Sequence, residues 1–168
     1  MAFWSTADVE PKRQFRFLVS NSSDDEAVWY WAKTITKPSF EISTTEHLLV
    51  NHKFKYPSTL TWNDITMTIV DTGEKTNDLL QRIRSTGYDY PTEFTTTEGI
   101  SKGAANEYLD EFTIQQLNSD GESIETWRLK GAFIKSTNFG DLDYESDALV
   151  TLQLTISYDW AELETFSA

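Results

Sequence analysis

Two histidines and one acidic run are the residues of this sequence whose types and spacing could do chemistry. His47 and His52 stand five positions apart in the expected strand 40–56. Side chains alternate between the two faces of a strand, so an odd spacing places these imidazoles on opposite faces and argues against joint metal binding. The chain has no cysteine, no phosphate-binding glycine loop and no Gly-x-Ser-x-Gly motif. The sequence therefore predicts no catalytic residue, no cofactor and no metal site.

The acidic run is "DLDYESD" at 141–147, with carboxylates at Asp141, Asp143, Glu145 and Asp147. Alternate carboxylates are typical of a calcium-binding loop, but this run lacks the glycine at the sixth position and the late bidentate glutamate. No pair of carboxylates is singled out for glycoside hydrolysis either. We interpret the run as an acidic turn at the rim of a sheet and expect no enzyme.

The charge of the whole chain is strongly negative, at −13, with a pI near 4.4. A protein that binds nucleic acid or an anionic membrane needs clustered Lys and Arg, and no Lys or Arg follows Lys135. The acidic surface either keeps a β-protein soluble or serves a function. No segment reaches the about 18 apolar residues of a membrane span, and residues 1–13 do not resemble a signal peptide.

The elements that must position these residues are mostly strands, because apolar and polar residues alternate along most of the chain. We expect a mainly β, antiparallel protein of one domain spanning 1–168, with a single helix at 74–86 that buries Leu79, Leu80 and Ile83 and ends at Gly87. A hairpin turns at Asp120–Gly121, and another joins the first two expected strands. The expected strands are 13–19, 27–36, 40–56 (ended by Pro57), 60–71, 107–118, 123–134 and 148–160.

Two segments show no periodicity: an N-terminal arm at 1–12 and a long loop at 88–106. Connections of this length in a compact domain are uncommon unless they contact something else. We therefore predict that both segments are inter-subunit elements, protected from proteolysis only in an assembly.

The closing strand has one apolar and one polar face. The expected core residues are Val150, Leu152, Leu154, Ile156 and Tyr158, and the opposite face carries Thr151, Gln153, Thr155 and Ser157. The two-residue period of a strand separates the two sets.

Two stretches resemble a known family: "TWNDITMTIVD" at 61–71 and "ETWRLKGAFIKSTNFGDLDYESDALVTLQLTISYDW" at 125–160. They are similar to the tail tube protein of contractile-tailed bacteriophages. The matching positions are the acidic-aromatic strand Trp62 to Val70, then Leu129, Gly131, Gly140 and Leu142, and finally Tyr158, Asp159 and Trp160.

The resemblance implies a β-sandwich or partial barrel with one flanking helix. Six copies would close into a ring whose inner sheets form one barrel, and rings would stack into a hollow tube. The implied partners are further copies of the chain, the tail sheath, the baseplate and the tail terminator, in a virion tail assembled in the host cytoplasm. Thr151, Gln153, Thr155 and Ser157 would line the lumen or an interface, and the acidic loop would lie at a rim. Phage DNA would pass transiently through a net negative lumen without tight binding.

Two other functions stay open. A baseplate tube initiator, or the tube of a secretion or injection system, would share the fold. A free carbohydrate-binding β-sandwich would instead use aromatic side chains such as Trp29, Tyr30 and Trp31 as stacking platforms, and would be a monomer.

Overall fold

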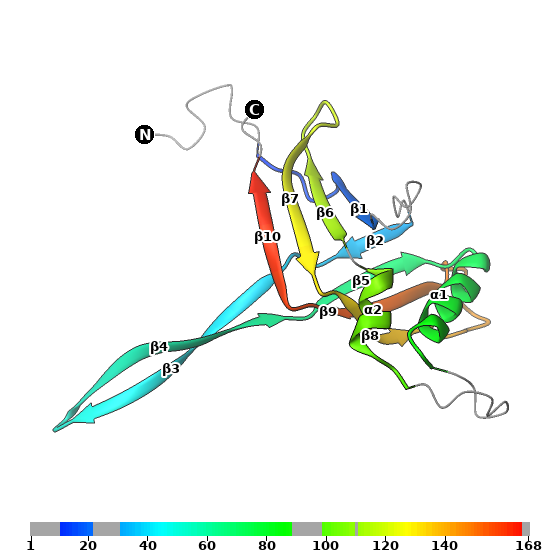
Figure 1. Ribbon diagram of the computed structural model, residues 1–168. Helices are drawn as coiled ribbons and strands as arrows, with labels where there is room; N and C mark the ends of the chain where they lie inside the picture. The colour runs from blue at the N-terminus through cyan, green and yellow to red at the C-terminus, as the bar shows by residue number, and fades with distance from the viewer. Residues whose placement is uncertain (1–10, 22–30, 89–98, 110, 166–168) are drawn as a thin grey trace.

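The computed structural model describes residues 11–21, 31–88, 99–109 and 111–165. Two four-stranded antiparallel sheets form the body, and a two-stranded arm projects far beyond it (Figure 1). The prediction of a mainly β, antiparallel fold is confirmed. The prediction of a single helix is wrong, because the described residues contain two.

The first sheet has the strand order β1–β6–β7–β10 and the second has the order β2–β5–β9–β8. In Figure 1 the strands of the two sheets run across one another. The arm consists of β3 and β4 alone. The strands are β1 (Phe17–Asn21), β2 (Ala32–Ile35), β3 (Ser39–Leu49), β4 (His52–Asn63), β5 (Ile65–Val70), β6 (Phe112–Leu117), β7 (Ser123–Lys130), β8 (Phe133–Asn138), β9 (Thr151–Ser157) and β10 (Trp160–Thr165).

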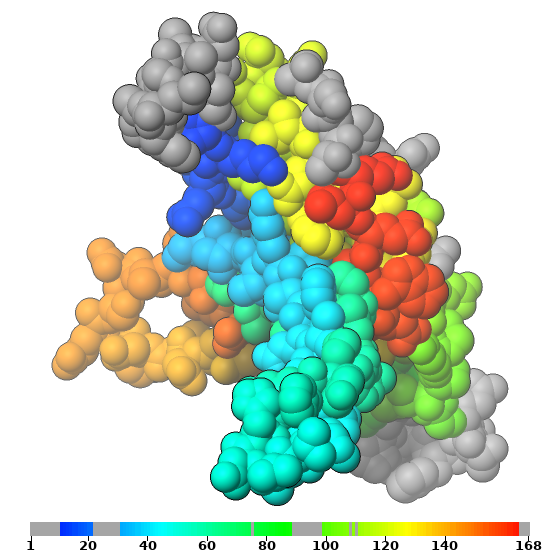
Figure 2. All heavy atoms as spheres, turned by 90° about the vertical axis from the view of Figure 1, so that its left-hand side faces the viewer, coloured from blue at the N-terminus to red at the C-terminus, as the bar shows by residue number. Residues whose placement is uncertain are grey.

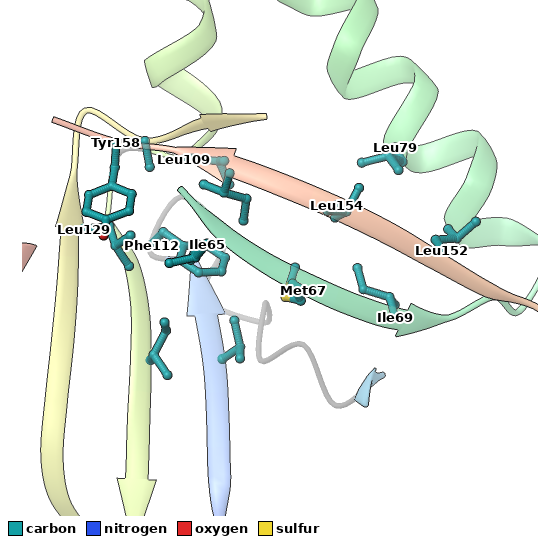
Figure 3. Close-up of a cluster of buried hydrophobic side chains, with 14 residues drawn as sticks. Ile65, Met67, Ile69, Leu79, Leu109, Phe112, Leu129, Leu152, Leu154 and Tyr158 are labelled. Atoms are coloured by element: carbon teal, nitrogen blue, oxygen red, sulfur yellow. The ribbon is translucent and has the colours of Figure 1, made fainter. Parts of the chain in front are cut away.

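The core lies between the two sheets (Figure 3). On β5 every second residue is buried, and the register sets Met67 opposite Leu154 of β9. Phe112 and Leu129 of the first sheet belong to the same buried cluster. Full burial of a large aliphatic or aromatic side chain stabilises a fold by about 1.5–3 kcal/mol, so this cluster is the main source of stability.

Two of the connections that carry the chain from one sheet to the other, β7–β8 and β9–β10, lie next to each other. Between β7 and β8, Gly131 has a φ of +65°, a conformation that glycine adopts without strain. A Cβ at this position would overlap the carboxylate of Asp159, which lies between β9 and β10. The Asp159 amide donates to the Lys130 carbonyl at 2.9 Å. The expected strands 123–134 and 148–160 are therefore each divided between the two sheets.

Helix α1 (Glu74–Ser85) confirms the predicted helix, and Leu79 is its buried residue. Asp71 organises its start: the carboxylate accepts from the Gly73 amide at 2.9 Å and from the Thr76 hydroxyl at 2.8 Å. These hydrogen bonds, with that of Gly73 first, hold the pKa of Asp71 below its usual value.

Helix α2 (Lys102–Tyr108) occupies part of the expected loop 88–106, of which residues 89–98 lie outside the described residues. The Ser101 side chain caps it by accepting from the Ala104 amide at 3.2 Å. Lys102 pairs with Asp159 at 2.5 Å, which ties α2 to the crossing between the sheets.

The predicted hairpin at Asp120–Gly121 is confirmed, because β6 and β7 pair on either side of it. The predicted hairpin between 13–19 and 27–36 is wrong. Strand β1 pairs with β6, and β2 pairs with β5 in the other sheet. Both strands contribute apolar side chains to the space between the sheets, and this long-range packing outweighs their closeness in sequence.

Candidate assembly interface

The β3–β4 arm is the most exposed regular element of the described structure. Every residue of β3 is exposed, and β4 is exposed until Thr61. Figure 1 shows the two strands leaving the body together, and Figure 2 views the arm end-on. An isolated two-stranded hairpin is at best marginally stable in water, so this exposed arm is a candidate contact surface.

The two faces of the arm differ in chemistry. The register sets Phe40 opposite Trp62 and Ile42 opposite Leu60 on one face of the root half of the arm. Beyond the bulge after Ile42 the aromatic side chains lie on the other face, because Tyr56 and Phe54 pair with Thr45 and His47, which are an odd number of residues from Ile42. Phe40 is 52% exposed and Ile42 49%. The apolar side chains of this root-half face, called the apolar arm face below, are Phe40, Ile42, Leu60 and Trp62.

Beyond the bulge, the face of the arm that carries Ile42 becomes polar and charged. Glu46 pairs with Lys53 at 3.0 Å and lies 4.0 Å from Lys55. These exposed pairs contribute little to stability, but they keep this face solvated. The apolar arm face is therefore confined to the root half of the arm, and it is uncovered in the single chain.

The arm corrects two expectations. Pro57 does not end a strand; it lies within β4 opposite Thr44, next to a bulge, where an edge strand tolerates proline. The chain turns instead after Leu49, where Val50 has a φ of +56°. His47 and His52 therefore lie on different strands and share one face near the tip with Phe54, and the His52 ring contacts the Phe54 ring at 4.7 Å.

The root of the arm is held by aromatic packing. The Trp62 ring lies 5.2 Å from the Phe40 ring and 5.9 Å from the ring of Tyr158, which is buried. Burial raises the pKa of Tyr158. Next to the root, Asp64 pairs with Lys135 of β8 at 2.6 Å; this hydrogen bond lowers the pKa of Asp64. The arm is thus anchored to both β8 and the closing segment.

A buried carboxylate that sequence reasoning missed also holds the arm root. The Glu125 side chain, on β7, is 8% exposed and binds the ammonium groups of Lys12 and, at 2.8 Å, Lys37. The Trp127 indole N–H donates to it at 2.6 Å. Burial opposes ionisation, but the hydrogen bonds outweigh it and lower the pKa of Glu125 from 4.5 to about 2. Only the alternation in "SIETWRLK", which places Glu125 on the strand, was available as a signal.

The closing strand contributes core on one face. Leu152, Leu154 and Ile156 are fully buried, and Tyr158 follows them just beyond the end of β9. Val150 precedes the strand and is half-buried, and its carbonyl accepts from the Asp71 amide at 2.9 Å.

The opposite face of the second sheet is uncharged along β5 and β9, and its side chains there are polar except for Val70. Thr66 lies beside Thr155, and Thr68 lies beside Gln153. Thr151 and Ser157 extend the same face along β9, and none of the four predicted residues on β9 is buried. This surface offers hydroxyl and amide groups rather than charge.

The four predicted rim acids, Asp141, Asp143, Glu145 and Asp147, lie in the connection between β8 and β9 and are exposed. Figure 2 shows this orange segment standing away from the body. Three large side chains on it, Leu142, Tyr144 and Leu149, are exposed as well. Within the described ranges, no group of three or more His, Cys, Asp or Glu residues could hold a metal ion.

No helix in the described part of the chain is long and apolar enough to cross a membrane. Of the aromatic triplet considered for sugar stacking, Trp31 is exposed and starts the segment leading into β2, whereas Trp29 and Tyr30 lie outside the described residues.

No protein-family model and no curated protein matches this sequence. Solved structures do match its fold. The sheath/tube terminator of the extracellular contractile injection system PVC is 21% identical, over 94% of this chain and 99% of that chain, with a TM-score of 0.71. A chain of the PVC sheath–tube complex in the extended state is also 21% identical, over 99% of both chains, with a TM-score of 0.71. The tube-terminating cap of the anti-feeding prophage is 20% identical, over 99% of this chain and 100% of that chain, with a TM-score of 0.67.

This similarity extends over nearly the whole of each chain, including the described arm and both sheets. The chain therefore has a tube-like fold that is shared with components of contractile injection systems.

Proposed function

We propose that this chain is a structural, non-enzymatic subunit of the inner tube of a contractile tail or injection machine. The observation that carries the proposal is the apolar arm face, which is uncovered in the single chain. Water-exposed apolar patches on amphipathic elements mark surfaces that are buried in an assembly. Further copies of the same chain are the proposed partners.

The second sheet supports closure into a ring. Its order β2–β5–β9–β8 leaves β2 and β8 as edges, and neighbouring strands alternate in direction throughout. If β8 of one copy lies beside β2 of the next, the new pair is again antiparallel. Such pairing satisfies the backbone groups of both edges and removes the exposed edges. We propose six copies per ring, with the uncharged polar face of β5 and β9 toward the lumen.

Stacking of rings through the arm would give a filament, because a head-to-tail contact that does not close on itself continues indefinitely. The tail sheath, the baseplate and the tail terminator are the further proposed partners. We propose the assembled tail as the location of the protein, and the host cytoplasm as its place of assembly.

For the cargo, we propose phage DNA that passes without tight binding. Total charge supports weak binding, since six copies at −13 repel a polyanion. The proposed lumen face adds no positive side chain along β5 and β9. Assembled tubes should release DNA at low salt; tight, salt-sensitive retention would contradict the proposal.

A second candidate is the tube of an injection system that carries other cargo. The names of the matching structures, which are injection-system components, favour it. A baseplate initiator of the same fold is a third possibility that the assembly test addresses.

The test is electron microscopy and sedimentation of the purified chain, alone and with its own baseplate proteins. We expect six-membered rings or tubes. A strictly monomeric chain under both conditions would overturn the proposal, and rings that cap a tube without extending it would assign the chain to initiation or termination.

A further inference from the structure

A groove of about 800 Å³ lies between the first sheet and strand β2. Its walls are apolar and aromatic, with Phe17, Ile35, Ile114 and Trp127 among the lining side chains. Phe15 stands at the same groove and is largely exposed. The groove is thus an opening in the side of the sandwich, where the two sheets part at their β1 and β2 edges.

The rim of the groove is basic in a chain that is otherwise acidic. Lys12, Lys33 and Lys37 line it. Glu125 neutralises part of this charge by binding Lys12 and Lys37. Lys33 is exposed on β2 and makes no ion pair with a described residue. Three ammonium groups against one carboxylate leave the groove net positive.

The β8–β9 loop has the complementary composition. Its four carboxylates alternate with the exposed side chains of Leu142 and Tyr144. A segment that interleaves acids with large apolar residues fits a groove that pairs lysines with aromatic walls, since it can bury apolar area and match charge together.

We propose that the β8–β9 loop of one copy docks into the lysine-rimmed groove of the next copy within a ring. The proposal rests on the proposed pairing of β8 with a neighbour's β2. In that antiparallel pair the end of β8 lies beside the start of β2, so the loop that leaves β8 at Asn138 reaches the neighbour at Ala32 and Lys33. The loop would then contact a neighbour within the same ring, and would not lie at the rim as expected from the sequence.

The chain has no cysteine, so single-cysteine variants of the full chain report contacts directly. Ser146→Cys places a thiol in the loop and Thr34→Cys places one in the groove; both positions are exposed. The two variants, one carrying a mass tag, are mixed and oxidised. We expect their mixed disulfide to form at least about tenfold faster than that of Asp120→Cys, at the β6–β7 turn, with Thr34→Cys, because a specific contact raises the effective concentration of the thiols.

The competing occupant of the groove is the arm tip of another copy, tested with Val50→Cys and Thr34→Cys. A faster disulfide from the arm tip than from the loop would overturn the proposal, as would loop and control pairs that react equally.

Charge exchange gives a second, independent readout. Lys33→Glu alone and Asp143→Lys alone should each weaken self-association about tenfold in sedimentation, because each creates like-charge repulsion. The double variant places the reversed pair in every interface and should restore most of the loss. An Asp120→Lys control should change nothing. Failure of the double variant to recover would contradict the contact.

The two proposals fail differently. A loop–groove disulfide in a protein that never forms rings would support the contact and overturn the tube. Rings without this disulfide would support the tube and overturn the contact.

Discussion

The root half of the arm and the β5–β9 pair are both antiparallel ribbons with one apolar face, but they differ in what covers it. On β5 and β9, Ile65, Met67 and Leu154 are fully buried within the core of the chain itself. On the arm, Phe40 and Ile42 remain about half exposed. Sequence alternation shows which face of a strand is apolar; it does not show whether the covering surface belongs to the same chain.

This difference separates folding from assembly. Apolar area stabilises a fold only when it is removed from water. The β5–β9 face therefore contributes to the stability of one chain, whereas the apolar arm face contributes only when a partner covers it. Substitutions in the two regions should have opposite profiles in melting and assembly experiments.

The largest expected effect is in the buried ribbon. Leu152→Asp places an unpaired carboxylate in the core, which costs several kcal/mol, comparable to the stability of a whole domain. We expect no soluble folded subunit, measured by soluble yield and thermal melting.

Its matched control is Thr155→Asp, on the polar face of the same strand. This variant should fold normally and at most disturb assembly or DNA passage. If Leu152→Asp folds while Thr155→Asp does not, the assigned faces of β9 are inverted, and the proposed lumen side with them.

An intermediate effect is expected at Glu125, which joins the first sheet to the arm root through Lys37. Glu125→Gln should cost about 2 kcal/mol at neutral pH, because it removes a carboxylate that two ammonium groups surround. Chemical denaturation of the unassembled chain measures it.

The pH dependence sharpens this prediction. The folded pKa of Glu125 is about 2, below its usual 4.5. Its contribution is therefore complete above about pH 4.5 and is lost as the pH falls toward 2. The difference in unfolding free energy between wild type and Glu125→Gln should shrink across this window; a constant difference would argue against the ion-pair role.

The smallest effect on folding is expected in the arm. Ile42→Asp adds a charge to an exposed strand and should change the unfolding free energy by less than about 0.5 kcal/mol. It should nevertheless abolish rings or tubes in electron microscopy. Thr61→Asp, which pairs with Glu41 on the opposite face of the arm root, is the control and should still assemble. Equal assembly of both variants would remove the apolar arm face from the interface.

The sequence predicted elements whose signals are local. Alternation located most strands, Asp120–Gly121 located a hairpin, and the spacing of Leu79 and Ile83 located α1. Helix α2 was missed because "KGAANEY" is short and because, among its residues whose burial is described, Ala105 alone is buried.

Features that depend on distant partners were not predictable in this way. The pairing of β1 with β6 joins residues about a hundred positions apart, and Lys12 and Glu125 meet across a similar separation. At Asp64, Gly131 and Asp159 the chain leaves one sheet and enters another, but the alternation of apolar and polar residues continues almost unbroken. The sequence pattern therefore predicted one continuous strand across each of these three positions. The candidate face of β9 was readable because alternation alone defines it.

The length of the arm converts a small rotation at its root into a large displacement of its tip. Twelve residues in β4, at a rise of about 3.3 Å each, span about 40 Å. A rotation of about 10° at the root would displace the tip by about 7 Å over that length, more than the spacing between neighbouring strands. The Trp62–Tyr158 contact and the Asp64–Lys135 pair therefore limit rotation of the arm at its root. Weakening either contact would widen the range of positions that the tip occupies, without any change in the residues of the tip itself.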